Sequence, residues 1–123
     1  MSLDPEFKKA EIHEKKWGRE IWIQNSEKYC GKILEFDKNS HFSMHYHMIK
    51  EETWYILVGK FILEYYDLEH AAKKSKELLV GDVIHIKPGV IHKLTSKSYG
   101  KIIEVSTQHF ETDSYRIEKS MSN

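Results

Sequence analysis

The residues best suited to chemistry are two histidines separated by a single residue, His45 and His47. If this segment is a β-strand, both imidazoles lie on the same face, because successive side chains of a strand alternate sides. Glu52 follows five residues after His47, and a third histidine, His92, comes much later in the chain. Three imidazole nitrogens and one carboxylate are a ligand set for a divalent transition metal. The pattern therefore predicts a metal site, provided that the fold brings these segments together.

The elements that must position these side chains are predicted to be short strands. Large apolar and polar residues alternate along many short segments, and turn residues such as Gly81-Asp82 and Pro88-Gly89 separate them. Short strands at regular spacing indicate an all-β sandwich or small barrel. The stretch 68–77 fits either a helical turn or a polar hairpin loop. The predicted strands are 17–24, 29–36, 41–48, 53–66 with a turn at Gly59-Lys60, 78–80, 83–86, 92–95, 101–107 and 114–117.

Length and composition limit the classes of function. A chain of 123 residues predicts one domain, and a formal net charge of zero argues against partners such as nucleic acid or anionic membrane. Cys30 is the only cysteine, which excludes an internal disulfide and favours a cytoplasmic protein. Residues 1–7 read as the translation of two adjacent cloning sites. We therefore expect one domain over residues 8–119, followed by a flexible tail over residues 120–123.

Two motifs resemble the paired motifs of the cupin superfamily. The first motif matches with His45, His47, Glu52 and Gly59, and it departs at its leading glycine, where Asn39 stands. Asparagine tolerates a positive φ better than most residues do, so the turn can form with this substitution.

The second cupin motif lies between residues 81 and 92. Gly81, Gly89 and His92 match it, whereas Lys87 occupies the usual proline position and Pro88 follows. The resemblance implies an antiparallel jelly-roll β-barrel, also called a double-stranded β-helix. It also implies that the three histidines and Glu52 together hold one divalent ion, which is Zn, Mn, Fe, Ni or Co. The alternative is a barrel with a polar interior that binds no metal.

A finer resemblance concerns the two ends of the chain. Lys16-Trp17-Gly18, the segment 103–107 and the segment 113–116 are similar to segments of mannose-6-phosphate isomerase-type cupins. This resemblance implies a sugar or sugar-phosphate isomerase that acts through a metal-stabilised enediolate. Glu104 is the candidate general base, because its parity on the strand directs it inward with Ile102. Arg116 is the candidate ligand of a phosphate or of sugar hydroxyls.

Several alternatives stay open at this point. Glu104 could equally be a hydrogen-bonded core carboxylate, and Arg116 could be half of a surface ion pair. The protein could be a non-catalytic module that binds a small carbohydrate, or a dioxygenase that uses Fe(II), since the same ligands serve dioxygen chemistry. Apolar residues at outward parity, together with the habit of small cupins, predict a homodimer.

Overall fold

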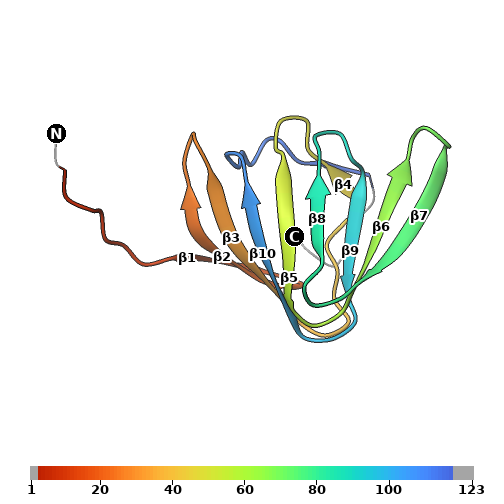
Figure 1. Cartoon of the computed structure of the whole chain (residues 1–123), viewed down its shortest axis with the longest axis horizontal. Helices are drawn as coiled ribbons and strands as arrows, with labels where there is room; N and C mark the ends of the chain where they lie inside the picture. Colours follow the sequence, from red (N-terminus) through yellow and green to blue (C-terminus); the bar gives the residue numbers. More distant parts are fainter. Residues whose placement is uncertain (1–2, 118–123) are drawn as a thin grey trace.

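The computed structural model describes residues 3–117, and these residues form strands and no helix. The segment before the first strand runs away from the rest of the fold (Figure 1). No helix among the described residues has the length and apolar character needed to cross a bilayer. The strands are β1 (Glu11–Lys15), β2 (Gly18–Asn25), β3 (Cys30–Phe36), β4 (His45–Tyr46), β5 (Glu52–Val58), β6 (Phe61–Asp67), β7 (Ala72–Leu78), β8 (Val83–Ile86), β9 (His92–Ser96), β10 (Gly100–Ser106) and β11 (Tyr115–Arg116).

The strands form two antiparallel sheets that face each other (Figure 1). One sheet has six strands in the order β1-β2-β3-β10-β5-β8, and the other has five in the order β11-β4-β9-β6-β7. Strands far apart in the sequence are therefore neighbours: β10 lies between β3 and β5, and β9 lies between β4 and β6. This arrangement confirms the predicted all-β jelly roll, and it brings His45 on β4 directly opposite His92 on β9.

The apolar core fills the space between the sheets. Burial alternates strictly along β3, where every second side chain from Cys30 to Phe36 points inward. That alternation is the period-two pattern of a sheet with one buried face. The buried apolar cluster consists of Trp17, Leu34, Phe36, Trp54, Ile56, Phe61, Leu63, Leu78, Ile86, Leu94 and Ile102.

Two turns confirm the conformational reasoning from the motifs. Asn39 has a φ of 59°, so asparagine adopts the left-handed conformation expected at the position of the motif's leading glycine. Gly59 has a φ of 92°, and a Cβ atom there would lie 2.6 Å from the carbonyl oxygen of Tyr99. Glycine is therefore required at position 59, where the chain turns from β5 into β6.

Several sequence predictions about the strands were wrong. The stretch 68–77, predicted as a helical turn or a polar hairpin loop, is a hairpin turn only at residues 68–71, and from Ala72 onward it belongs to the strand β7, which pairs along its whole length with β6. Residues 78–80 do not form a separate strand, because Leu78 ends β7. The predicted strand 41–48 reduces to the short β4 and one isolated bridge at His41. β1 was missed, and β11 is shorter than predicted. The predicted tail, 120–123, lies outside the described residues.

Candidate metal centre

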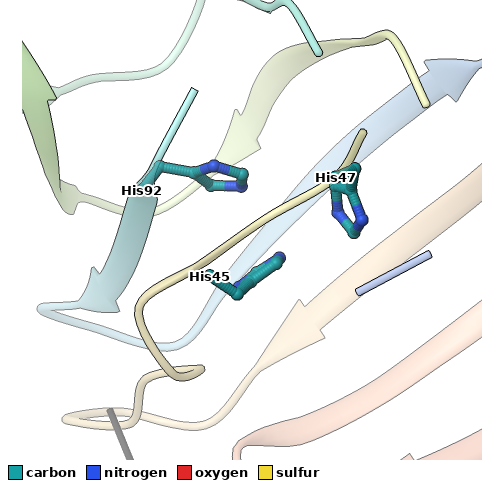
Figure 2. A group of neighbouring side chains, drawn as sticks. All are labelled: His45, His47 and His92. Atoms are coloured by element: carbon teal, nitrogen blue, oxygen red, sulfur yellow. The ribbon is translucent and has the colours of Figure 1, made fainter. Parts of the chain in front are cut away.

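Two histidines of the five-stranded sheet, on β4 and β9, meet inside the jelly roll with His47, which directly follows β4. One ring nitrogen from each of His45, His47 and His92 lies within 4.8 Å of the other two. The ring centroids of His45 and His92 are 4.6 Å apart, and those of His45 and His47 are 4.9 Å apart. Figure 2 shows the three rings around a common space, with His92 on a separate strand from the other two. The fold thus gathers the predicted histidines from both motifs.

Backbone carbonyl groups fix the tautomer of all three imidazoles. The Nδ1 atoms of His45, His47 and His92 lie 2.7, 2.7 and 2.9 Å from the carbonyl oxygens of Ser43, Asp113 and Val90. A carbonyl can only accept, so each Nδ1 carries the proton and each Nε2 keeps its lone pair. This outer hydrogen bond is the usual way in which a metal-binding histidine is oriented.

Burial keeps these imidazoles neutral. Burial, with the neighbouring charges of His92 and His47, holds the pKa of His45 well below its usual 6.5. Burial lowers the pKa of His92 to about 4, and burial and the charge of Lys50 lower the pKa of His47. Neutral imidazoles at pH 7 are the form that binds a metal ion.

Glu52 lies beside this cluster with one oxygen unsatisfied. Its Oε1 accepts a hydrogen bond of 2.6 Å from Nε1 of Trp54. Its Oε2 is buried without a hydrogen-bond partner and lies 3.4 Å from Nε2 of His47. Nε2 of His92 is likewise buried without a partner. Unpartnered buried acceptors are costly, and a divalent cation between them would satisfy both. At this site, the residues whose ligand atoms all lie within 4.8 Å of one another are the three histidines, and Glu52 lies near His47, so the histidines form the candidate metal group and Glu52 stays a predicted fourth ligand.

Asp113 ties the loop between His47 and Glu52 to the C-terminal segment. Its carboxylate accepts hydrogen bonds from the backbone N–H groups of Met48, Ile49 and Lys50, at 2.9, 3.1 and 3.0 Å. Its backbone carbonyl holds His47. Asp113 therefore positions the loop that connects two of the candidate ligands.

Two buried lysines and two further carboxylates line the same interior. Nζ of Lys50 lies 2.7 Å from Oε2 of Glu104, and Nζ of Lys32 lies 3.3 Å from Oε1 of Glu20. Lys32, Lys50 and Glu104 are almost completely buried. The inward position of Glu104 agrees with its strand parity, whereas sequence reasoning missed Lys32, Lys50 and Glu20. Lys32 carried a readable signal, because it alternates with Cys30, Leu34 and Phe36 on β3.

The buried carboxyl groups have opposite protonation tendencies. Burial and the charge of Glu104 raise the pKa of Glu52. Burial alone would also raise the pKa of Glu104, but the charges of Lys50 and Lys32 outweigh it and lower that pKa. Glu104 is therefore ionised. A divalent cation beside Glu52 would favour the ionised form of Glu52 as well.

The cluster opens into a small polar cavity of about 230 Å³. Arg116 lines this cavity and pairs across β11 and β4 with His45, so it stands beside the candidate ligands. The cavity is smaller than most ligand pockets, which favours a small substrate. The structure thus brings every predicted site residue to one cavity, and their roles in metal binding and catalysis stay predictions. The charged and polar residues that line this cavity are Lys15, Glu20, Lys32, Ser43, His45, His47, Lys50, Glu52, His92, Glu104, His109, Glu111, Ser114 and Arg116.

No protein-family model and no curated protein sequence matches the chain. Solved structures do match it. The oxalate decarboxylase of Lactobacillus farciminis, solved as a formate complex, has a TM-score of 0.75 and 16% identity over 88% of this chain and 34% of that chain. The oxalate decarboxylase of Bacillus subtilis at pH 4.6 has a TM-score of 0.76 and 16% identity over 88% of this chain and 30% of that one.

A third similar structure is CapF of Staphylococcus aureus, a capsular polysaccharide assembling protein. It has a TM-score of 0.75 and 12% identity over 91% of this chain and 33% of that chain. The chain thus spans about a third of the length of each of these proteins. Identities this low show the fold alone. The chain has the jelly-roll fold of the cupins, and within it a three-histidine cluster that could hold a metal ion.

Proposed function

We propose that this protein is a metal-dependent isomerase of a small sugar or sugar phosphate. The observation that carries the metal-binding part is the convergence of His45, His47 and His92, each with an unprotonated Nε2, beside the unsatisfied oxygen of Glu52 near His47. Such a site suits a divalent transition metal. Its identity is open among Zn, Mn, Fe, Ni and Co; one similar structure, the oxalate decarboxylase of B. subtilis, is described with Mn(II) centres.

The chemistry of an aldose–ketose isomerase would fall to groups already in the cavity. A bound divalent ion polarises a substrate carbonyl and stabilises negative charge on its oxygen. Glu104 is ionised and buried, so it can accept the α-proton of the substrate. Lys50 holds the carboxylate of Glu104 at 2.7 Å and restricts its orientation. Arg116, at the edge of the cavity, is the candidate contact for a phosphate.

Metal analysis of protein purified without an affinity tag tests the first part of the proposal. We expect about one divalent ion per chain, and we expect the His45→Ala, His47→Ala double variant to lose it. The matched control is His85→Ala, because His85 is exposed and pairs with the exposed carboxylate of Glu51, away from the three-histidine cluster. Metal that persists in the first variant would show that the ligands are elsewhere.

Isomerase assays on a panel of aldose phosphates test the second part. We expect Glu104→Gln to keep the metal and to lose on the order of 100-fold in kcat, the usual contribution of a general base. Two other outcomes would replace the proposal. Consumption of dioxygen with ferrous iron would identify a dioxygenase, and saturable sugar binding without turnover would identify a non-catalytic carbohydrate-binding protein.

A further inference from the structure

A second cavity opens along one side of the jelly roll, between β8 and the hairpin of β6 and β7. β8 is the last strand of the six-stranded sheet, and β7 is the last strand of the five-stranded sheet. The volume of this cavity, which we call the side groove, is about 880 Å³, whereas that of the metal cavity is about 230 Å³. The two cavities share no lining residue. The side groove is therefore separate from the candidate metal centre, and its volume is typical of small-molecule sites.

The side groove is present because the two sheets do not cover each other completely at this edge. β8 has four residues, whereas β6 and β7 have seven each. Along the inward face of β6, burial falls from Leu63 to the half-buried Tyr65, and along the same face of β7 it falls from Leu78 to the exposed Lys76. In Figure 1 the outer end of this hairpin leans away from β8. The inward face of the hairpin is thus open toward its turn.

The floor of the side groove is apolar. It is formed by three members of the buried core and by three half-buried side chains that pack against that core. The core members are Leu63, Leu78 and Ile86, and the half-buried ones are Tyr65, Ile84 and Val90. Apolar surface that stays in contact with water at a concave site favours the binding of an apolar group. The floor therefore indicates a ligand with an apolar body.

Lys76 adds a positive charge to this apolar floor. It pairs in register with Leu63 across β7 and β6, so both side chains are on the inward face of the sheet. Lys87, in the loop that follows β8, contributes a second ammonium group to the lining. Among the described residues, no hydrogen bond or ion pair engages the ammonium group of either lysine. Both charges are therefore available to a ligand.

The carboxylates of the side groove, in contrast, are already engaged by groups of the chain. The carboxylate of Asp67 lies 2.8 Å from Nδ1 of His70 and 2.7 Å from Nζ of Lys74. The carboxylate of Asp82 accepts the backbone N–H of Leu79 at 2.8 Å. The charge left unpaired at the side groove is thus positive, and it complements an anion.

We propose that the side groove binds a small amphipathic carboxylate, whose aliphatic chain lies on the apolar floor and whose head group contacts Lys76. An ammonium group and a carboxylate form a charge-assisted hydrogen bond. The chain supplies most of the affinity, since each buried CH₂ group raises it by up to about fourfold. An exposed ion pair adds less, up to about fivefold. This inference depends neither on isomerase activity nor on a bound metal.

Isothermal titration calorimetry of the full chain with decanoate, below the concentration at which it forms micelles, tests the site. Three probes with the same aliphatic chain isolate the effect of the head group: decanoate, 1-decanol and decyltrimethylammonium. We expect decanoate to bind roughly fivefold more tightly than 1-decanol, and the cation to bind more weakly than either. Octanoate, which is two CH₂ groups shorter, should bind about tenfold more weakly than decanoate.

Two variants test the location of the site. Lys76→Glu reverses the charge of an exposed residue, so the fold should tolerate it, and we expect decanoate affinity to fall by about tenfold while 1-decanol affinity is unchanged. The matched control is Lys28→Glu, the same change at an exposed lysine between β2 and β3. Ile84→Glu, checked for folding by circular dichroism, puts a carboxylate in the floor and should weaken the binding of both decanoate and 1-decanol.

A carboxylate can also bind a metal ion, so the titration is repeated with an excess of chelator. We expect the same affinity, because none of the three clustered histidines lines the side groove. The proposal is overturned if decanoate does not bind, if its binding disappears with chelator, or if 1-decanol or the cation binds as tightly as decanoate. It is equally overturned if Lys76→Glu and Lys28→Glu change decanoate affinity to the same extent, or if folded Ile84→Glu binds decanoate as the unaltered protein does.

Discussion

Replacing Asp113 by asparagine tests whether one carboxylate positions the metal-binding loop. The carboxylate accepts three backbone N–H groups from residues 48–50, which connect His47 to Glu52. Asparagine has nearly the same shape, but its NH₂ group would face an N–H donor and could not accept from it. The change therefore removes the charge and at least one hydrogen bond without opening a cavity.

The expected loss follows from the number of bonds and from the charge of the acceptor. A hydrogen bond to a charged group contributes about 1.5–3 kcal/mol, and a buried N–H left unpaired costs about 1–3 kcal/mol. One lost bond and two weakened bonds give about 2–4 kcal/mol of lost unfolding free energy. The carbonyl of residue 113 also orients His47, so we expect metal affinity to fall by about 10- to 100-fold, as it does when groups behind a ligand are altered.

Urea unfolding of the metal-free protein measures the first effect, and competition with a chromophoric chelator measures the second. The matched control is Asp82→Asn, because Asp82 accepts a single backbone N–H, from Leu79 at 2.8 Å, on the exposed surface. We expect the control to lose less than about 1 kcal/mol and to keep its metal affinity. Equal losses in the two variants, or unchanged metal affinity in Asp113→Asn, would refute the positioning role.

Three further predictions concern the interior. Trp54→Phe keeps an aromatic side chain but removes the indole N–H that holds Glu52, and we expect metal affinity measured by chelator competition to fall by roughly tenfold. Lys50→Met leaves Glu104 buried without its partner, so urea unfolding should show a loss of about 3–5 kcal/mol, which Glu104→Gln in the same chain should largely restore. Burial, then nearby lysine charges, lower the pKa of His109 to about 4, so between pH 6.5 and pH 4 the unfolded chain binds more protons than the folded one. Unfolding free energy should therefore fall as pH drops through this window, by on the order of 2 kcal/mol from this group after allowance for solvent screening. His109→Gln should remove about that much of the pH dependence, measured by urea unfolding at a series of pH values.

The strands that sequence analysis located well are those with one buried face and defined ends. β8 was predicted with its observed bounds, because Gly81-Asp82 precedes it and Pro88-Gly89 follows it. β9 and β10 were predicted to within a residue or two at each end. Here the local pattern and the tertiary packing agree, so period-two alternation was sufficient.

β7 could not be predicted in this way. Five consecutive residues, Lys73–Glu77, are exposed, so burial does not alternate along this strand. The strand exists because it pairs with β6 over seven residue pairs, which local propensity does not reveal. The opposite error occurred at residues 41–48, where alternating residue types suggested a full strand. Only His45 and Tyr46 of that segment pair as β4, because the chain bends at Met44 before them and at Met48 after them.

The net charge inside the jelly roll could not be predicted from the spacing of residues within single motifs. This charge determines which substrates the cavity would attract. Lys32 and Lys50 are buried beside Glu104, Glu52 and the half-buried Glu20, and these five residues come from four different segments of the chain. With neutral histidines, and with Glu52 ionised beside a divalent ion, this interior would carry an excess of one positive charge. A cavity of that charge in a low-dielectric interior attracts anions, because the field of buried charges is weakly screened. The loaded site would therefore favour a sugar phosphate over the neutral sugar of the same shape.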